Sequence, residues 1–297
     1  QDERMQAVAI ATQLDYYYFQ GTNEDSVIHY TNKVKEFAKA THQPKYYYFA
    51  WANRLVTYYL KTSRTNIALY EVQNMLKEAQ KEDDKTGLSR CYNIMSQIYT
   101  IKRFDSMAFE WRLKEIELTE KYNIENYNIS QTYAQIANYY ISQKKQKEAL
   151  RAVEKAISTA NSSTQRISAK LEYVNYYSKF GDFQAAEKIL KECQIAFEQD
   201  KRLESIKKRL YNIECLYYQQ TRQYQKALEA AEMQEKEEHR LSESILSSSH
   251  YRTQGEIYQK MGNMNLAVKY LQMYINTDDT LKIANEQVAS SEFATLF

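Results

Sequence analysis

Amide and guanidinium side chains recur at related places in the sequence and could bind a ligand through hydrogen bonds. A side-chain amide can donate to a C=O and accept from an N–H of an extended peptide, and a guanidinium can receive a carboxylate. A surface that only meets solvent would also be polar, so ligand binding and plain solvation are both open interpretations. The candidate ligand-binding residues are Asn53, Thr57, Arg90, Asn93, Gln97, Asn138, Asn175, Arg209, Asn212 and Gln219.

The sequence contains no recognisable catalytic or metal-binding constellation. It has no GxGxxG, GxxxxGK[ST], GxSxG or HExxH motif. Glu235 and His239 are four residues apart, but the charged run around them is typical of a solvated helix face. Cys91, Cys193 and Cys215 form no CxxC pair and are expected to be small core residues. We therefore expect no enzyme activity, no metal and no cofactor in this chain.

The composition predicts an all-α protein. The 297 residues include 40 Lys or Arg and 38 Asp or Glu, a net charge of +2, which argues against a nucleic-acid-binding surface. Five glycines and one proline are too few for the turns of a β-rich fold. The densest apolar run, residues 46–52, is too short to cross a membrane. Because the chain begins at Gln1, we expect a processed piece of a longer protein.

A repeat of about 40 residues organises the candidate residues. In six places a tyrosine, here called a marker tyrosine, is followed nine residues later by a marker alanine. The pairs are Tyr59 and Ala68, Tyr99 and Ala108, Tyr140 and Ala149, Tyr177 and Ala186, Tyr218 and Ala227, and Tyr258 and Ala267, with Tyr17 and Ser26 as a degenerate seventh. This spacing predicts helical hairpins in which the alanine lies on the inner face of the second helix, where only a methyl group fits.

The turn of each hairpin is predicted four residues after its marker tyrosine. A small or β-branched residue stands mostly three positions before the tyrosine and shares its helix face. The turn candidates are Ser63, Arg103, Lys144, Gly181, Arg222 and Gly262.

This small-x-x-Tyr, turn and Ala arrangement resembles the tetratricopeptide repeat. The pattern is seen best in Gln254, Gly255, Tyr258, Gly262, Asn263 and Ala267, and again in Tyr177, Gly181, Asp182 and Ala186. The resemblance implies a right-handed superhelical solenoid of about seven hairpins over residues 1–277, with a degenerate first repeat. Its concave face would be lined by the first helices and would bind a peptide, a protein or a small molecule. Because the period is nearer 40 than the usual 34 residues, each helix should be about a turn longer.

The carboxyl-terminal residues 270–281 and 290–297 resemble the exit segment of tetratricopeptide regions in Bacteroidetes-type sensor histidine kinases. The resemblance implies a periplasmic sensor module of a two-component system, with residues 278–297 as a connector helix towards a missing membrane or signalling segment. A homodimer through this segment is a further expectation. The alternatives are a cytoplasmic peptide-pheromone-type transcriptional regulator and a plain protein-interaction scaffold.

Overall fold

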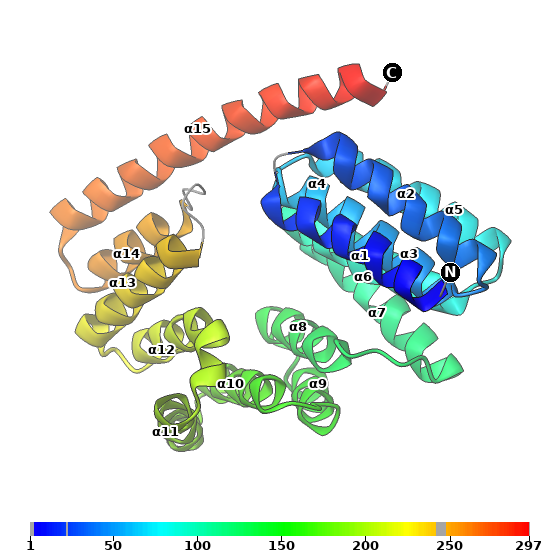
Figure 1. Ribbon diagram of the computed structural model, residues 1–297. Coiled ribbons are helices and arrows are strands. Elements are labelled where there is room, and N and C mark those ends of the chain that lie inside the picture. The colour runs from blue at the N-terminus through cyan, green and yellow to red at the C-terminus, as the bar shows by residue number, and fades with distance from the viewer. Residues whose placement is uncertain (1–2, 22, 242–247, 297) are drawn as a thin grey trace. The chain divides into compact units, whose positions relative to one another are not determined.

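The computed structural model describes residues 3–21, 23–241 and 248–296, and these residues form helices joined by short turns, without a β-strand (Figure 1). The helices follow one another as seven hairpins. They are α1 (Glu3–Gln20) with α2 (Glu24–Ala40); the continuous α3 (Pro44–Ala50), η1 (Trp51–Val56) and α4 (Thr57–Lys61) with α5 (Thr65–Lys81); α6 (Lys85–Ile101) with α7 (Asp105–Tyr122); α8 (Ile129–Ser142) with α9 (Gln146–Ser158); α10 (Ser163–Phe180) with α11 (Phe183–Gln199); η2 (Lys201–Ile206) and α12 (Lys207–Gln220) with α13 (Tyr224–Leu241); and α14 (Ser249–Lys260) with α15 (Met264–Leu296).

The marker alanines lie at the closest points of the hairpins. Each sits on the second helix of its pair and is shielded from solvent, five of them at 0% exposure and Ala267 at 2%. The residues three before the tyrosines are buried as well, including Val56, Ala137 and Val174 at 0%. The register predicted from the sequence is therefore confirmed.

The predicted turn residues adopt the left-handed backbone conformation. All six have positive φ angles, between 57° and 91°. The amide of the next residue then donates to the C=O of the marker tyrosine at 2.8 to 3.0 Å, as Lys145 N does to Tyr140 O. This six-to-one bond closes a helix in the Schellman manner. Only Gly181 and Gly262 of the six are glycines, so the hydrogen bond, and not residue type alone, fixes the turn.

Close helix contact explains one of the small residues in the pattern. A Cβ atom added to Gly255 on α14 would lie 2.8 Å from Cγ of Leu271 on α15. Beside it the rings of Tyr258 and Tyr270 stack with their centroids 5.3 Å apart. Glycine is thus required at position 255 because the two helices touch there.

The described chain groups into two compact units. One unit comprises the residues up to Asn126 together with those from Ala284 onwards, and the other comprises Tyr127–Ile283. Each has its own core: Tyr48, Met75 and Ile98 are fully buried in the first, and Leu171 and Ile257 in the second. Helix α15 contributes its first part to the second unit and its end to the first. The division predicted from the sequence, with a repeat array at residues 1–277 and a connector helix at residues 278–297, stays a prediction.

Candidate functional site

The candidate site lies in the second unit, where successive first helices pack side by side. Helix α10 contacts both α8 and α12, so the three helices form one continuous surface, here called the first-helix surface. Asn138 lies on α8, Asn175 on α10 and Asn212 on α12. The structure thus brings three of the predicted amides onto neighbouring helices of one unit.

Asn138 and Asn175 form a hydrogen-bonded pair across two of these helices. The Nδ2 atom of Asn175 donates to Oδ1 of Asn138 at 2.7 Å, and both side chains are half-buried. A head-to-tail amide pair leaves one N–H2 group and one C=O group without a partner in the described structure. The pair lines a cavity of about 210 Å³, together with Ile141, Ser178 and Leu216. The remaining donor and acceptor of the pair therefore belong to residues that line an open space.

A larger cavity of about 460 Å³ lies on the same unit around Asn212. Its described lining has uncharged polar side chains, small apolar ones and two cationic residues, but no carboxylate. The lining residues are Ser130, Gln131, Ala134, Thr164, Gln165, Ser168, Ala169, Ser205, Ile206, Lys208, Arg209, Asn212 and Gln234. This lining suits a ligand that forms hydrogen bonds, and it places no acidic side chain where an anionic group of the ligand would be repelled.

Arg209 has a structural partner on the neighbouring first helix. Its Nη2 atom donates to Oε1 of Glu172, a side chain that is 1% exposed. The second carboxylate oxygen of Glu172 and Nε of Arg209 are also buried and have no hydrogen-bond partner. Arg209 therefore neutralises a buried carboxylate, and it is not an unengaged receptor for a ligand carboxylate as the sequence had suggested.

The candidate residues of the first unit are mostly engaged with one another. Arg90 donates from Nη1 to Oδ1 of Asn53 at 2.8 Å, and burial lowers the pKa of its guanidinium. Asn93 donates to both oxygens of the buried Glu115, at 3.1 and 3.2 Å, and accepts from Nε2 of Gln97 at 2.7 Å. These hydrogen bonds join side chains of neighbouring helices within the unit, although Nε of Arg90 is buried without a partner.

Thr57 and Gln219 are also engaged locally. The hydroxyl of Thr57, which directly follows the π-helical segment η1, donates to the Ala52 carbonyl of that segment at 3.0 Å. Gln219 accepts at Oε1 from Nζ of Lys260 at 2.9 Å. Of the ten predicted residues, Asn138, Asn175, Arg209 and Asn212 thus line the cavities of the second unit.

Sequence reasoning missed Gln131 and Ser168, which line the larger cavity. Each lies nine residues before a marker tyrosine, Tyr140 and Tyr177, and Arg209 holds the same position before Tyr218. The predicted set includes this position only through Arg90, nine residues before Tyr99, and Arg209. Applying the same position to every repeat would have found Gln131 and Ser168.

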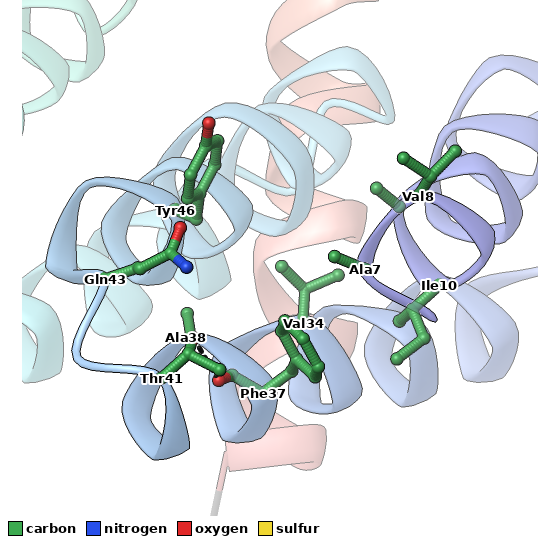
Figure 2. Close-up of a pocket in the computed structure, with 10 residues that line it drawn as sticks. Ala7, Val8, Ile10, Val34, Phe37, Ala38, Thr41, Gln43 and Tyr46 are labelled. Carbon is green, nitrogen blue, oxygen red and sulfur yellow. Dashed lines mark hydrogen bonds between the residues drawn. The ribbon is translucent and has the colours of Figure 1, made fainter. Parts of the chain in front are cut away.

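A third cavity, of about 460 Å³, belongs to the first unit and has a different character (Figure 2). It lies between α1, α2 and the start of α3, where Val8, Val34 and Phe37 form apolar walls. None of its described lining residues carries a charge, and its polar members are Thr41, Gln43 and Tyr46. Its lining does not offer the paired amides of the second unit.

Within the described ranges, no group of three His, Cys, Asp or Glu side chains is placed to hold a metal ion. The three cysteines are buried, as the sequence predicted. Burial raises the pKa of the Cys91 thiol to about 12 and that of Cys193 to about 11, so both stay protonated and unreactive at neutral pH. Among the helices described, none has the combined length and apolar character that crossing a membrane requires.

Comparison with known proteins identifies the fold. No family model and no curated protein matches the sequence. The solved structure of RapI in its apo form is 15% identical, with a TM-score of 0.64 over 91% of this chain and 98% of that chain. NprR in complex with its cognate peptide NprX is 13% identical, with a TM-score of 0.63 over 93% of this chain and 78% of that chain. A tetratricopeptide repeat protein from Parabacteroides merdae is 14% identical, with a TM-score of 0.56 over 96% and 99%. The chain therefore has an all-α, tetratricopeptide-like fold.

Proposed function

We propose that this chain is a non-catalytic module that binds an extended peptide segment on the first-helix surface of its second unit. The observation that carries the proposal is the Asn138–Asn175 pair, which presents one donor and one acceptor beside a cavity. The solved complex of NprR with the peptide NprX, on a similar fold, supports the choice of a peptide.

Peptide chemistry fits this surface for two reasons. An extended main chain offers N–H and C=O groups in alternation, so a pair of amides can bind it without requiring a particular sequence. Specificity would then come from side chains that enter the cavities of about 210 and 460 Å³. The larger cavity, with Gln131, Ser168 and Asn212 in its wall, has further polar groups for such contacts.

The test is a double substitution, Asn138→Ala with Asn175→Ala. The double substitution removes both members of the hydrogen-bonded pair, so no amide is left without its partner. The fold should therefore be retained. Two lost hydrogen bonds at about 0.5 to 1.5 kcal/mol each should weaken binding by about fivefold to a hundredfold. The probe is an immobilised library of extended peptides, from which the strongest wild-type binders are selected for titration.

The matched control is Gln184→Ala, which removes an exposed amide from α11, a second helix of the same unit. This variant should bind the selected peptides as the wild type does. If the double variant also keeps its affinity, the two asparagines are solvated surface residues and the proposal fails.

We further propose that this module is the periplasmic sensor part of a two-component histidine kinase. The resemblance of residues 270–281 and 290–297 to the exit segment of such sensors supports this role. A peptide-responsive cytoplasmic regulator is the second candidate, which the fold similarity to the peptide-bound NprR favours. The sequence of the full-length gene separates them: a downstream membrane helix and kinase motifs support the first, and an upstream DNA-binding domain supports the second.

A further inference from the structure

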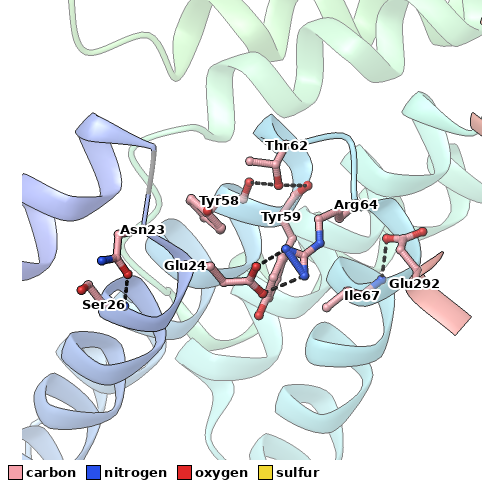
Figure 3. Close-up of polar contacts among 9 residues, drawn as sticks. All are labelled: Asn23, Glu24, Ser26, Tyr58, Tyr59, Thr62, Arg64, Ile67 and Glu292. Atoms are coloured by element: carbon pink, nitrogen blue, oxygen red, sulfur yellow. Dashed lines mark hydrogen bonds and ion pairs between the residues drawn. The ribbon is translucent and has the colours of Figure 1, made fainter. Parts of the chain in front are cut away.

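The amino end of α5 receives its cap from a residue far along the chain. Backbone amides in the first turn of a helix have no acceptor within the helix. The N-cap residue of α5, Arg64, supplies no capping side chain, because its guanidinium binds both carboxylate oxygens of Glu24 on α2 (Figure 3). The open amides of α5 must therefore find another acceptor.

Glu292, near the end of α15, is that acceptor. Its Oε1 atom accepts from the backbone amides of Asn66 at 3.0 Å and Ile67 at 3.2 Å. Its Oε2 atom accepts from Nδ2 of Asn66 at 2.8 Å. Figure 3 shows the carboxylate directed at the first turn of α5. Both oxygens are thus bound, within the first unit, by donors from residues 226 and 225 positions away.

The surroundings of this carboxylate favour a negative charge. The amino end of a helix carries a partial positive charge. The ammonium of Lys102 donates to Oδ1 of Asn66 at 2.9 Å, which orients Nδ2 of that amide towards Glu292. The Glu292 side chain is 2% exposed, so water does not compete for these bonds.

The described residues that precede Glu292 in this segment are much less buried than Glu292. Between Ala284 and Glu292, the only buried side chain among those described is Glu292 itself. Val288 and Ala289 are half-buried, and the other described side chains are exposed. Over residues 284–292, the attachment that the structure describes is therefore centred on the polar bonds to the Glu292 carboxylate.

We propose that the amino end of α5 is a carboxylate-recognition site that the chain fills with its own Glu292, so that residues 284–296 act as a releasable intramolecular latch. Loss of the negative charge, or a second negative charge at the site, releases the segment while α5 stays folded. The latch is independent of the proposed peptide site, since Asn138 and Asn175 belong to the other unit.

The test is hydrogen exchange of the backbone amides of residues 284–291 in the full chain. Glu292→Ala should raise their exchange rates at least tenfold, and it should also expose the amides of Asn66 and Ile67. Glu286→Ala, which removes an exposed carboxylate from the same helix, is the matched control and should leave the rates unchanged. Equal exchange in the wild type and in Glu292→Ala would overturn the proposal, as would an equal effect of Glu286→Ala.

A second variant separates release of the latch from loss of folding. Asn66→Asp places a carboxylate in the first turn of α5, where it suits the helix but repels Glu292. The melting temperature should therefore not fall, whereas residues 284–291 should exchange at least tenfold faster. Adding Glu292→Gln to Asn66→Asp should restore protection, because the Gln amide can donate to the new carboxylate. If residues 284–291 exchange at the wild-type rate in Asn66→Asp, there is no intramolecular latch. The same conclusion follows if these residues of the wild type are protected only at high protein concentration.

Discussion

Replacing the marker alanine Ala149 with leucine should overpack the hairpin of α8 and α9. Ala149 is 0% exposed and lies just after the turn. Its amide donates to the Lys145 carbonyl at 2.9 Å, and the Lys145 amide donates to the Tyr140 carbonyl at 2.9 Å. The backbone at this point is held on both sides, so it cannot move aside to admit three more carbon atoms.

The expected cost is about 1 to 3 kcal/mol or more in the free energy of unfolding. For a chain of this size, this corresponds to a fall of about 2 to 12 °C in the melting temperature. The matched control is Arg151→Leu, which places the same side chain at an exposed position of α9 and changes helix propensity little.

Differential scanning calorimetry is the assay, with hydrogen exchange in α9 to locate the effect. Because the chain forms two compact units, its unfolding need not be a single transition, and the transition that includes α9 is the one to follow. If Ala149→Leu melts where Arg151→Leu melts, the tyrosine-to-alanine register is not the packing rule described above.

Three further predictions test packing and electrostatics elsewhere. Arg209→Met should cost about 3 to 5 kcal/mol, because it leaves the buried Glu172 carboxylate unpaired; adding Glu172→Gln should recover most of this loss in urea unfolding. Gly87→Ala should destabilise the protein, because the new Cβ would lie 2.6 Å from the ring of Tyr48, which is 0% exposed. Alanine is the better helix former, so a raised melting temperature would contradict this prediction. Burial raises the pKa of Cys91 from 9.0 to about 12, so the contribution of this thiol to stability is present below pH 9 and is lost as the pH rises towards 12. The free energy of unfolding should therefore fall less steeply over this pH range in Cys91→Ala than in the wild type. An identical slope in the two proteins would refute the prediction.

The sequence predicts the repeat well because its determinants are local. The marker alanine, the turn and the small residue before the tyrosine all lie within about a dozen positions of one another, and the methyl group at Ala227 or Ala186 is required by the hairpin itself. The six-to-one hydrogen bond to the tyrosine carbonyl likewise depends only on a short stretch of backbone.

The side-chain partners of the candidate residues could not be predicted in the same way. Arg209 and Glu172 are 37 residues apart, as are Asn175 and Asn138, and their contacts depend on how neighbouring repeats pack. Asn93 shares the polar character of Asn138, yet it binds a buried glutamate and serves the fold. Which amides remain available for a ligand is therefore a property of the three-dimensional structure.

The contact of Glu292 with α5 was outside the reach of repeat analysis. It joins residues 226 positions apart and follows no period. The described residues just before Glu292 are mostly exposed and form no apolar face that would indicate docking. Phe297, which the sequence analysis places in the connector, lies outside the described residues.

The most direct test of peptide binding is the NMR spectrum of the side-chain amide groups while a selected peptide is added. We predict that the NH2 resonances of Asn138 and Asn175 shift together along the binding curve, whereas that of Asn93, already bound to Glu115, stays in place. A peptide that saturates the protein without moving the Asn138 and Asn175 resonances would contradict the proposed site.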